Sequence, residues 1–474
     1  MNVVAVEIDV ERYLRQKKPK QIQLNRWSSV LFWWMAIGIF FELPYFCTNG
    51  RGLPLLKIAR TVIEFSRFEL PNGLRVLVHE DHSTPMVALN VLYNVGARDE
   101  SPERTGLAHL FEHLMFGGSA NIPNFDEPIQ QAGGENNAFT NNDITNFYDI
   151  VPAENAEIAF WLESDRMLSL NFDEQVLEVQ RKVVVEEFKE TCLNQPYGDV
   201  WHHLSDMAYK VHPYRWPTIG KVPQHVEKTT MDDVKSFFYQ YYRPNNAILV
   251  IAGNMGMEQA KTLTEKWFGE IPSGEIPERH LPTEPPQKKL EARINRAKVP
   301  LDAIYLAFHA PGRLEEDYYA TDLLTDVLAN GPSSRLYRRL VMEQGIVSHI
   351  DSYITGNIDP GLLIVEAKPS EGISLEKVEA AIWKELKQLM DTPLTSRELE
   401  KVKNKVESTL VFSETNVLNK AINLAFFELI GDADLINKEV NYYLAIEEKD
   451  LQKAAQKIFT QENCSRLYYH ANQE

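Results

Sequence analysis

His109, Glu112 and His113 share one short amphipathic segment, GLAHLFEHLMF, at residues 106–116. On a helix, residues i and i+4 lie one turn apart on the same face, so the two histidines can direct imidazole nitrogens at one point. Zinc binds nitrogen at about 2.0 to 2.1 Å in tetrahedral geometry, and two imidazoles would supply half of its ligands. Glu112 lies at the rim of that face, where its carboxylate can reach a water molecule without being a ligand.

The H-x-x-E-H spacing is that of inverted zincins. A hydrogen-bonded pair of buried histidines is the alternative, and the glycines at 106, 117 and 118, which bound a single helix, count against it. A catalytic zinc needs a third protein ligand and leaves the fourth position to water. RKVVVEEFKE, further along the chain, offers Glu186 and Glu187, and the spacing alone does not choose between them.

The elements that must position these residues begin at about residue 65. RFELPNGLRVLVHED predicts two short strands around an Asn-Gly turn, and a further strand is expected at 86–95. Helices are expected at 153–168 and over EQVLEVQRKVVVEEFKETCL, where apolar residues recur at helical spacing although the three consecutive valines favour strand.

Five prolines between residues 271 and 289 predict an extended linker. After it, the order of strands and helices repeats, with DAIYLAFHAPGR in the place of the 86–95 strand. We therefore expect an α+β protein with two homologous domains, at 65–270 and 290–474, each a largely antiparallel sheet covered by helices on one face. The zinc motif lies only in the first.

Composition restricts the class of protein further. The 474-residue chain has a net charge of −18, which disfavours nucleic acid and anionic membrane surfaces as partners. Cys47, Cys192 and Cys464 form no C-x-x-C pair, so any metal must use His, Asp or Glu ligands. Residues 1–60 combine basic residues with an apolar run, as signals or anchors do, although a mis-assigned start remains an alternative. We expect a cell-envelope, periplasmic or membrane-anchored protein if this segment is a signal or anchor, and a cytoplasmic one otherwise.

Three motifs, HLFEH, NNAFT and RKVVVEE, resemble those of the pitrilysin/insulinase family of zinc metallopeptidases, especially its short branch with mitochondrial processing peptidase β subunits. The resemblance runs from about residue 65 to the C-terminus and implies half of a clamshell with one Zn²⁺ per chain. It assigns His109, His113 and Glu187 as ligands and Glu112 as general base. It also implies that substrate binds as an added strand along Asn137, Ala138, Phe139 and Thr140.

By this resemblance the chain is a zinc endopeptidase that hydrolyses short unfolded peptides through a zinc-activated water. Two departures from the family pattern matter. Gln180 replaces a frequent acidic residue, and Val341 and Ser348 stand where an Arg and a Tyr that hold the substrate are expected, with Arg335, Tyr337 and Arg339 nearby. We therefore expect a homologous subunit, or a second copy in a homodimer, to supply that pair. The alternatives are a non-catalytic assembly subunit and a peptide-binding subunit of the same family.

Overall fold

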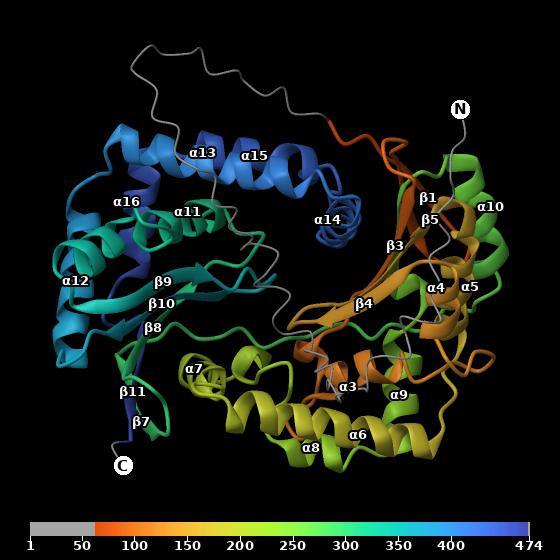
Figure 1. The fold of residues 1–474 in the computed structure, drawn as a ribbon, viewed down its shortest axis with the longest axis horizontal. Helices are drawn as coiled ribbons and strands as arrows, with labels where there is room; N and C mark the ends of the chain where they lie inside the picture. Colours follow the sequence, from red (N-terminus) through yellow and green to blue (C-terminus); the bar gives the residue numbers. More distant parts are fainter. Residues whose placement is uncertain (1–61, 473–474) are drawn as a thin grey trace, which may run out of the picture. The chain divides into compact units, whose positions relative to one another are not determined.

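The computed structural model describes residues 62–472, which form two β-sheets with flanking helices (Figure 1). The first sheet has the strand order β1-β2-β6-β3-β5-β4, with β4 at one edge. Neighbouring strands are antiparallel except β2 and β6, which are parallel. Its strands are β1 (Ser66–Glu69), β2 (Arg75–Glu80), β3 (Met86–Tyr93), β4 (Glu135–Thr140), β5 (Thr145–Pro152) and β6 (Ala247–Gly253).

The second sheet has the order β7-β11-β8-β10-β9 and likewise contains one parallel pair, β7 and β11. Its strands are β7 (Glu291–Ala297), β8 (Ala303–Ala310), β9 (Val347–Ile354), β10 (Gly361–Pro369) and β11 (Cys464–Ala471). Between the sheets in sequence, residues 269–290 form no helix or strand. This stretch contains the expected linker, and the division of the chain into domains there remains a proposal.

Helices pack on both sheets. Those of the first half are α3 (Leu107–Leu114), α4 (Asp126–Gln131), α5 (Glu157–Leu168), α6 (Glu174–Phe188), α7 (Val200–Ala208), α8 (Pro223–Glu227), α9 (Met231–Tyr241) and α10 (Met257–Phe268). Those of the second half are α11 (Tyr318–Leu328), α12 (Leu375–Asp391), α13 (Ser396–Ser413), α14 (Val417–Leu429), α15 (Leu435–Ala445) and α16 (Glu448–Ile458). Two π-helical segments, η4 (Lys189–Asn194) and η7 (Tyr337–Glu343), complete these halves. The α+β class with two largely antiparallel sheets is confirmed.

The two halves exchange helices, which the sequence did not predict. From the second half, α14 packs on the open face of the first sheet, where Ala421, Leu424 and Ala425 contact β-strand side chains in one apolar cluster (Figure 1). From the first half, α7 packs on a face of the second sheet through Leu204 and Met207. Each sheet thus completes its core with a helix from the other half.

The expected signal or anchor at residues 1–60 lies outside the described residues. Within 62–472, no helix is both long and apolar enough to cross a membrane.

Candidate metal centre

Helix α3 carries the first three site residues, and its apolar face fixes its orientation. Leu107, Leu110 and Phe111 are buried in the core of the first half. The helix begins after Gly106, whose φ of +87° places it in the left-handed region that glycine adopts readily. An added Cβ there would lie 2.8 Å from the backbone oxygen of Ile219, so a larger residue would clash.

A buried glutamate before the helix holds its first turn. Glu100 accepts hydrogen bonds from the backbone N–H groups of Gly106 (2.9 Å) and Ala108 (2.8 Å), donors that would otherwise lack a partner at a helix N-terminus. Burial raises the pKa of Glu100 to about 8, against the opposite effect of these two donors. Sequence reasoning missed Glu100, and its only local signal is an acidic residue shortly before the helix start.

His109, His113 and Glu187 converge, with one ligand atom from each lying within 4.8 Å of the others. Glu187 Oε2 is 3.3 Å from His113 Nε2 and 3.7 Å from His109 Nε2. Ligands about 2.1 Å from a tetrahedral zinc are separated by roughly 3.4 Å. These atoms therefore lie at the spacing that a zinc ion requires.

The chemistry of the donors also fits a metal. His109 is 2% exposed, and in the described part of the chain neither of its ring nitrogens has a hydrogen-bond partner. Burial lowers the pKa of His109, so the neutral imidazole that binds metals is favoured. A buried imidazole without a hydrogen bond is costly unless an ion completes its surroundings.

Glu112 lies on the same helix but outside the group of three converging side chains. Its carboxylate is 6% exposed, and Oε2 has no hydrogen-bond partner among residues 62–472. A buried carboxylate oxygen without a hydrogen-bond partner is costly unless a further group completes its surroundings.

Helix α6 determines which of the two candidate glutamates faces α3. Asp173 caps the start of α6 by accepting from the N–H groups of Gln175 and Val176. Glu186 then points into solvent and pairs with Lys189 at 2.6 Å, whereas the Glu187 side chain is only 9% exposed. The geometry thus places Glu187, and not Glu186, beside the two histidines. Gln180 is half-buried on the same helix.

The four residues expected to bind substrate all lie in β4, at the edge of the first sheet beside α3. Asn137 is exposed, Ala138 is buried in the core of the first half, and Phe139 and Thr140 are half-buried. β4 pairs with β5 on one side only, so within the described sheet its other side has no strand partner.

The second half shows how the candidate arginines are used. Val341 lies in η7, and Tyr337 packs against the hydrophobic core of the second half. The Ser348 hydroxyl in β9 donates a hydrogen bond to a backbone oxygen of β10 at 3.2 Å. Arg335 makes two hydrogen bonds, of 2.9 and 3.1 Å, to a glutamate of α13. Arg339 pairs with two other glutamates. Both arginines are thus held by carboxylates of their own half.

The fold thus consists of two halves, each with a β-sheet and helices, and the first half carries the group formed by His109, His113 and Glu187. Two family models match the chain: "Insulinase (Peptidase family M16)" at residues 75–221 and "Peptidase M16 inactive domain" at residues 228–406. The chain belongs to this peptidase family.

Individual relatives agree with this assignment. The chain is 28% identical to the zinc protease PqqE of Helicobacter pylori, over 82% of this chain and 89% of the relative. It is 26% identical to YmxG of Bacillus subtilis, an uncharacterized zinc protease, over 84% and 96%. The crystal structure of a protease from Helicobacter pylori superposes with a TM-score of 0.82 at 27% identity, covering 86% of this chain and all of that one.

Proposed function

We propose that this chain is a zinc-dependent endopeptidase that binds one Zn²⁺ through His109, His113 and Glu187. The observation that carries the proposal is the convergence of these three donors around a buried imidazole that has no hydrogen bond in residues 62–472. Its relatives named zinc proteases also support zinc as the metal.

A zinc ion held at such a centre lowers the pKa of water and polarises a peptide carbonyl. Glu112 takes the proton from the attacking water and then delivers it to the departing amine. The burial of Glu112 and its position on the same helix as two of the donors support this role.

Strand β4 orients the substrate by pairing with its backbone. Main-chain hydrogen bonds to an edge strand tolerate many sequences, and Asn137, Ala138, Phe139 and Thr140 form the strand offered. Only an extended chain can add in this way, which agrees with the short, unfolded peptides expected as substrates.

A second subunit completes the substrate site in this proposal. Val341 and Ser348 cannot provide the guanidinium and phenol that the family pattern calls for, and Arg335 and Arg339 are held in ion pairs. A homologous chain, or a second copy of this one, supplies them. The same departure favours the second candidate function, a non-catalytic or peptide-binding subunit.

The decisive variant is Glu112→Gln, which keeps the size of the side chain but removes its basicity. We expect the variant to retain one zinc per chain and to lose hydrolysis of unfolded peptides, measured with and without the candidate partner. Hydrolysis at the wild-type rate by the variant would refute the assignment of Glu112. A zinc-loaded wild type that is inactive with its partner would instead favour the non-catalytic function.

A further inference from the structure

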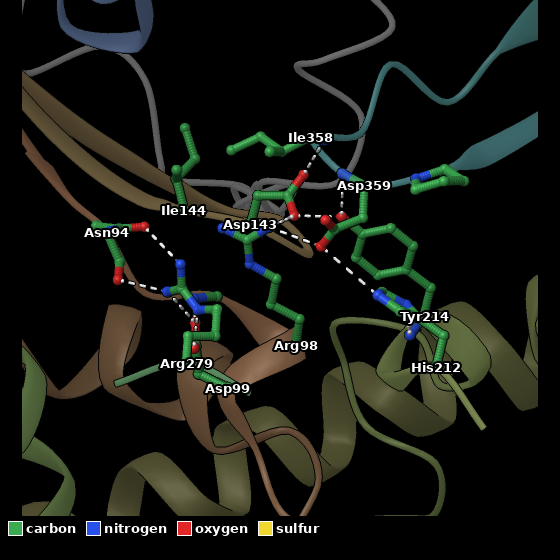
Figure 2. A network of polar contacts seen from close by, with 12 residues as sticks. Asn94, Arg98, Asp99, Asp143, Ile144, His212, Tyr214, Arg279, Ile358 and Asp359 are labelled. Atoms are coloured by element: carbon green, nitrogen blue, oxygen red, sulfur yellow. Dashed lines mark hydrogen bonds and ion pairs between the residues drawn. The ribbon is translucent and has the colours of Figure 1, made fainter. Parts of the chain in front are cut away.

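Three consecutive charged residues, Arg98, Asp99 and Glu100, contact three different parts of the chain. They lie in and directly after a short 3₁₀ turn, η2 (Ala97–Asp99), between β3 and α3. We call residues 98–100 the junction. Figure 2 shows the contacts that Arg98 and Asp99 make.

Arg98 connects the junction to the second half. One guanidinium nitrogen lies 2.9 Å from Asp143, after β4, and 3.0 Å from Asp359, in the loop between β9 and β10 (Figure 2). The backbone N–H of Ile358 in that loop also donates to Asp143 at 2.9 Å, and Tyr214 donates to Asp143 as well. Arg98 is 4% exposed, so its charge is balanced by carboxylates from both halves rather than by water.

Asp99 connects the junction to the segment between the sheets. Arg279 donates to its two carboxylate oxygens at 2.7 and 3.1 Å and also binds Asn94 at the end of β3 (Figure 2). A bidentate pair of this kind fixes direction as well as distance.

Glu100 connects the junction to the metal-binding helix through the N–H groups of Gly106 and Ala108. The backbone of the turn is also bonded to the segment that follows β4, because the N–H groups of Ala97 and Arg98 donate to the backbone oxygens of residues 141 and 142. Close approach makes this possible: a Cβ on Gly96 would lie 2.5 Å from the oxygen of Asn142.

We propose that Asp359, in the half without the zinc motif, is a positioning residue for the metal centre. Through Arg98 it holds the junction, and through Glu100 the junction holds the first turn of α3, which carries His109. Retention of the metal by the first half then depends on its contact with the second. The proposal rests on the proposed metal site, but one arm of its test does not require a metal.

The test compares Asp359→Asn with Asp302→Asn in the full chain. Both carboxylates belong to the second half and both are 34% exposed. Asp359 faces Arg98 and His212, whereas Asp302 contacts His470 and the backbone of Ala471 instead of the junction. Loss of Zn²⁺ to an excess of a chelating dye gives the dissociation rate. Substituting residues that hydrogen-bond to metal ligands costs about 10- to 100-fold in metal affinity. Asp359 is more remote from the ligands, so we expect Asp359→Asn to lose zinc about 5-fold faster than the wild type. For Asp302→Asn, the rate of zinc loss should stay within about 1.5-fold of the wild-type rate, because Asp302 does not contact the junction.

Hydrogen exchange of the metal-free chain is the second arm. Asp359→Asn should speed exchange at the N–H groups of Gly106 and Ala108 by about 5-fold, relative to the Asp302 variant. Glu100→Gln should also speed zinc loss. In the double variant Asp359→Asn/Glu100→Gln, the fold increase in the rate of zinc loss should be smaller than the product of the two single increases, because both substitutions act through one chain of contacts.

Equal rates of zinc loss from the Asp359 and Asp302 variants would overturn the proposal. It would also be overturned if the increase in the double variant equalled the product of the increases caused by Asp359→Asn and Glu100→Gln alone. If Asp359→Asn does not fold, Arg98→Gln, which removes the positive charge that joins Asp143 to Asp359, must show the same acceleration, and wild-type rates in it would also overturn the proposal. A wild type that binds no zinc would refute the proposed function, and the exchange arm would still decide whether the junction holds α3.

Discussion

Glu187→Gln removes the one charged donor of the proposed centre while keeping its shape. Four-ligand structural zinc sites bind with about 10 to 16 kcal/mol, or about 3 kcal/mol per ligand if shared equally. At about 1.4 kcal/mol per tenfold change, losing this ligand weakens zinc binding by about 100-fold. The estimate applies here because Glu187 Oε2 lies within 3.3 to 3.7 Å of the two imidazole nitrogens, close enough to share one ion with them.

The neighbouring residue supplies the control. Glu186 has the same chemistry and helix but is exposed and paired with Lys189. Competition with a chelator of known affinity should show a loss of about 100-fold for Glu187→Gln and less than about twofold for Glu186→Gln. Equal affinities for the wild type and the Glu187 variant, or a larger loss in the Glu186 variant, would refute the ligand assignment.

Three further predictions concern β4, the exchanged helix and one buried acid. Asn137→Ala should raise KM for an unfolded peptide about 5-fold, which corresponds to the loss of one neutral hydrogen bond, and should leave the zinc content unchanged. An unaltered KM would show that the Asn137 side chain does not bind the substrate. Leu424→Ala on α14, at a fully buried position, should lower the free energy of unfolding in urea by about 3 kcal/mol, and a loss below about 1 kcal/mol would show that α14 does not complete the first core. Burial raises the pKa of Asp322 to about 6, so the folded chain binds this proton more tightly than the unfolded chain and stability falls as pH rises from about 4 to 6. Asp322→Asn, which still accepts from Tyr443, should therefore gain about 2 kcal/mol over the wild type between pH 4 and 7 in paired denaturation curves, and a pH-independent difference would contradict this.

Local patterns predicted most of the elements. The Asn-Gly turn joins β1 and β2 as expected, with Ser66 opposite Val78. The segment with three consecutive valines is helical as α6, because its apolar residues at helical spacing pack into the core and override their preference for strands. Periodicity reports local structure well because each side chain's neighbours lie within one or two turns.

Contacts between distant parts of the chain were not predictable in this way. The exchange of α7 and α14 depends on faces that match only after both sheets form, and both helices look like ordinary amphipathic segments in sequence. The junction joins Arg98 to Asp359 across more than half of the chain, and single charged residues carry no signal of their partners. For the metal centre, local spacing placed His109 and His113 on one helix, but selecting Glu187 from its neighbour required the family resemblance or the packing of α6.

The most direct test of the central claim is anomalous diffraction at the zinc edge from crystals of the zinc-loaded chain. We expect one peak per chain at about 2.0 to 2.2 Å from a nitrogen of His109, a nitrogen of His113 and an oxygen of Glu187. A fully loaded crystal with its peak elsewhere, or with Glu187 turned away from the ion, would contradict it.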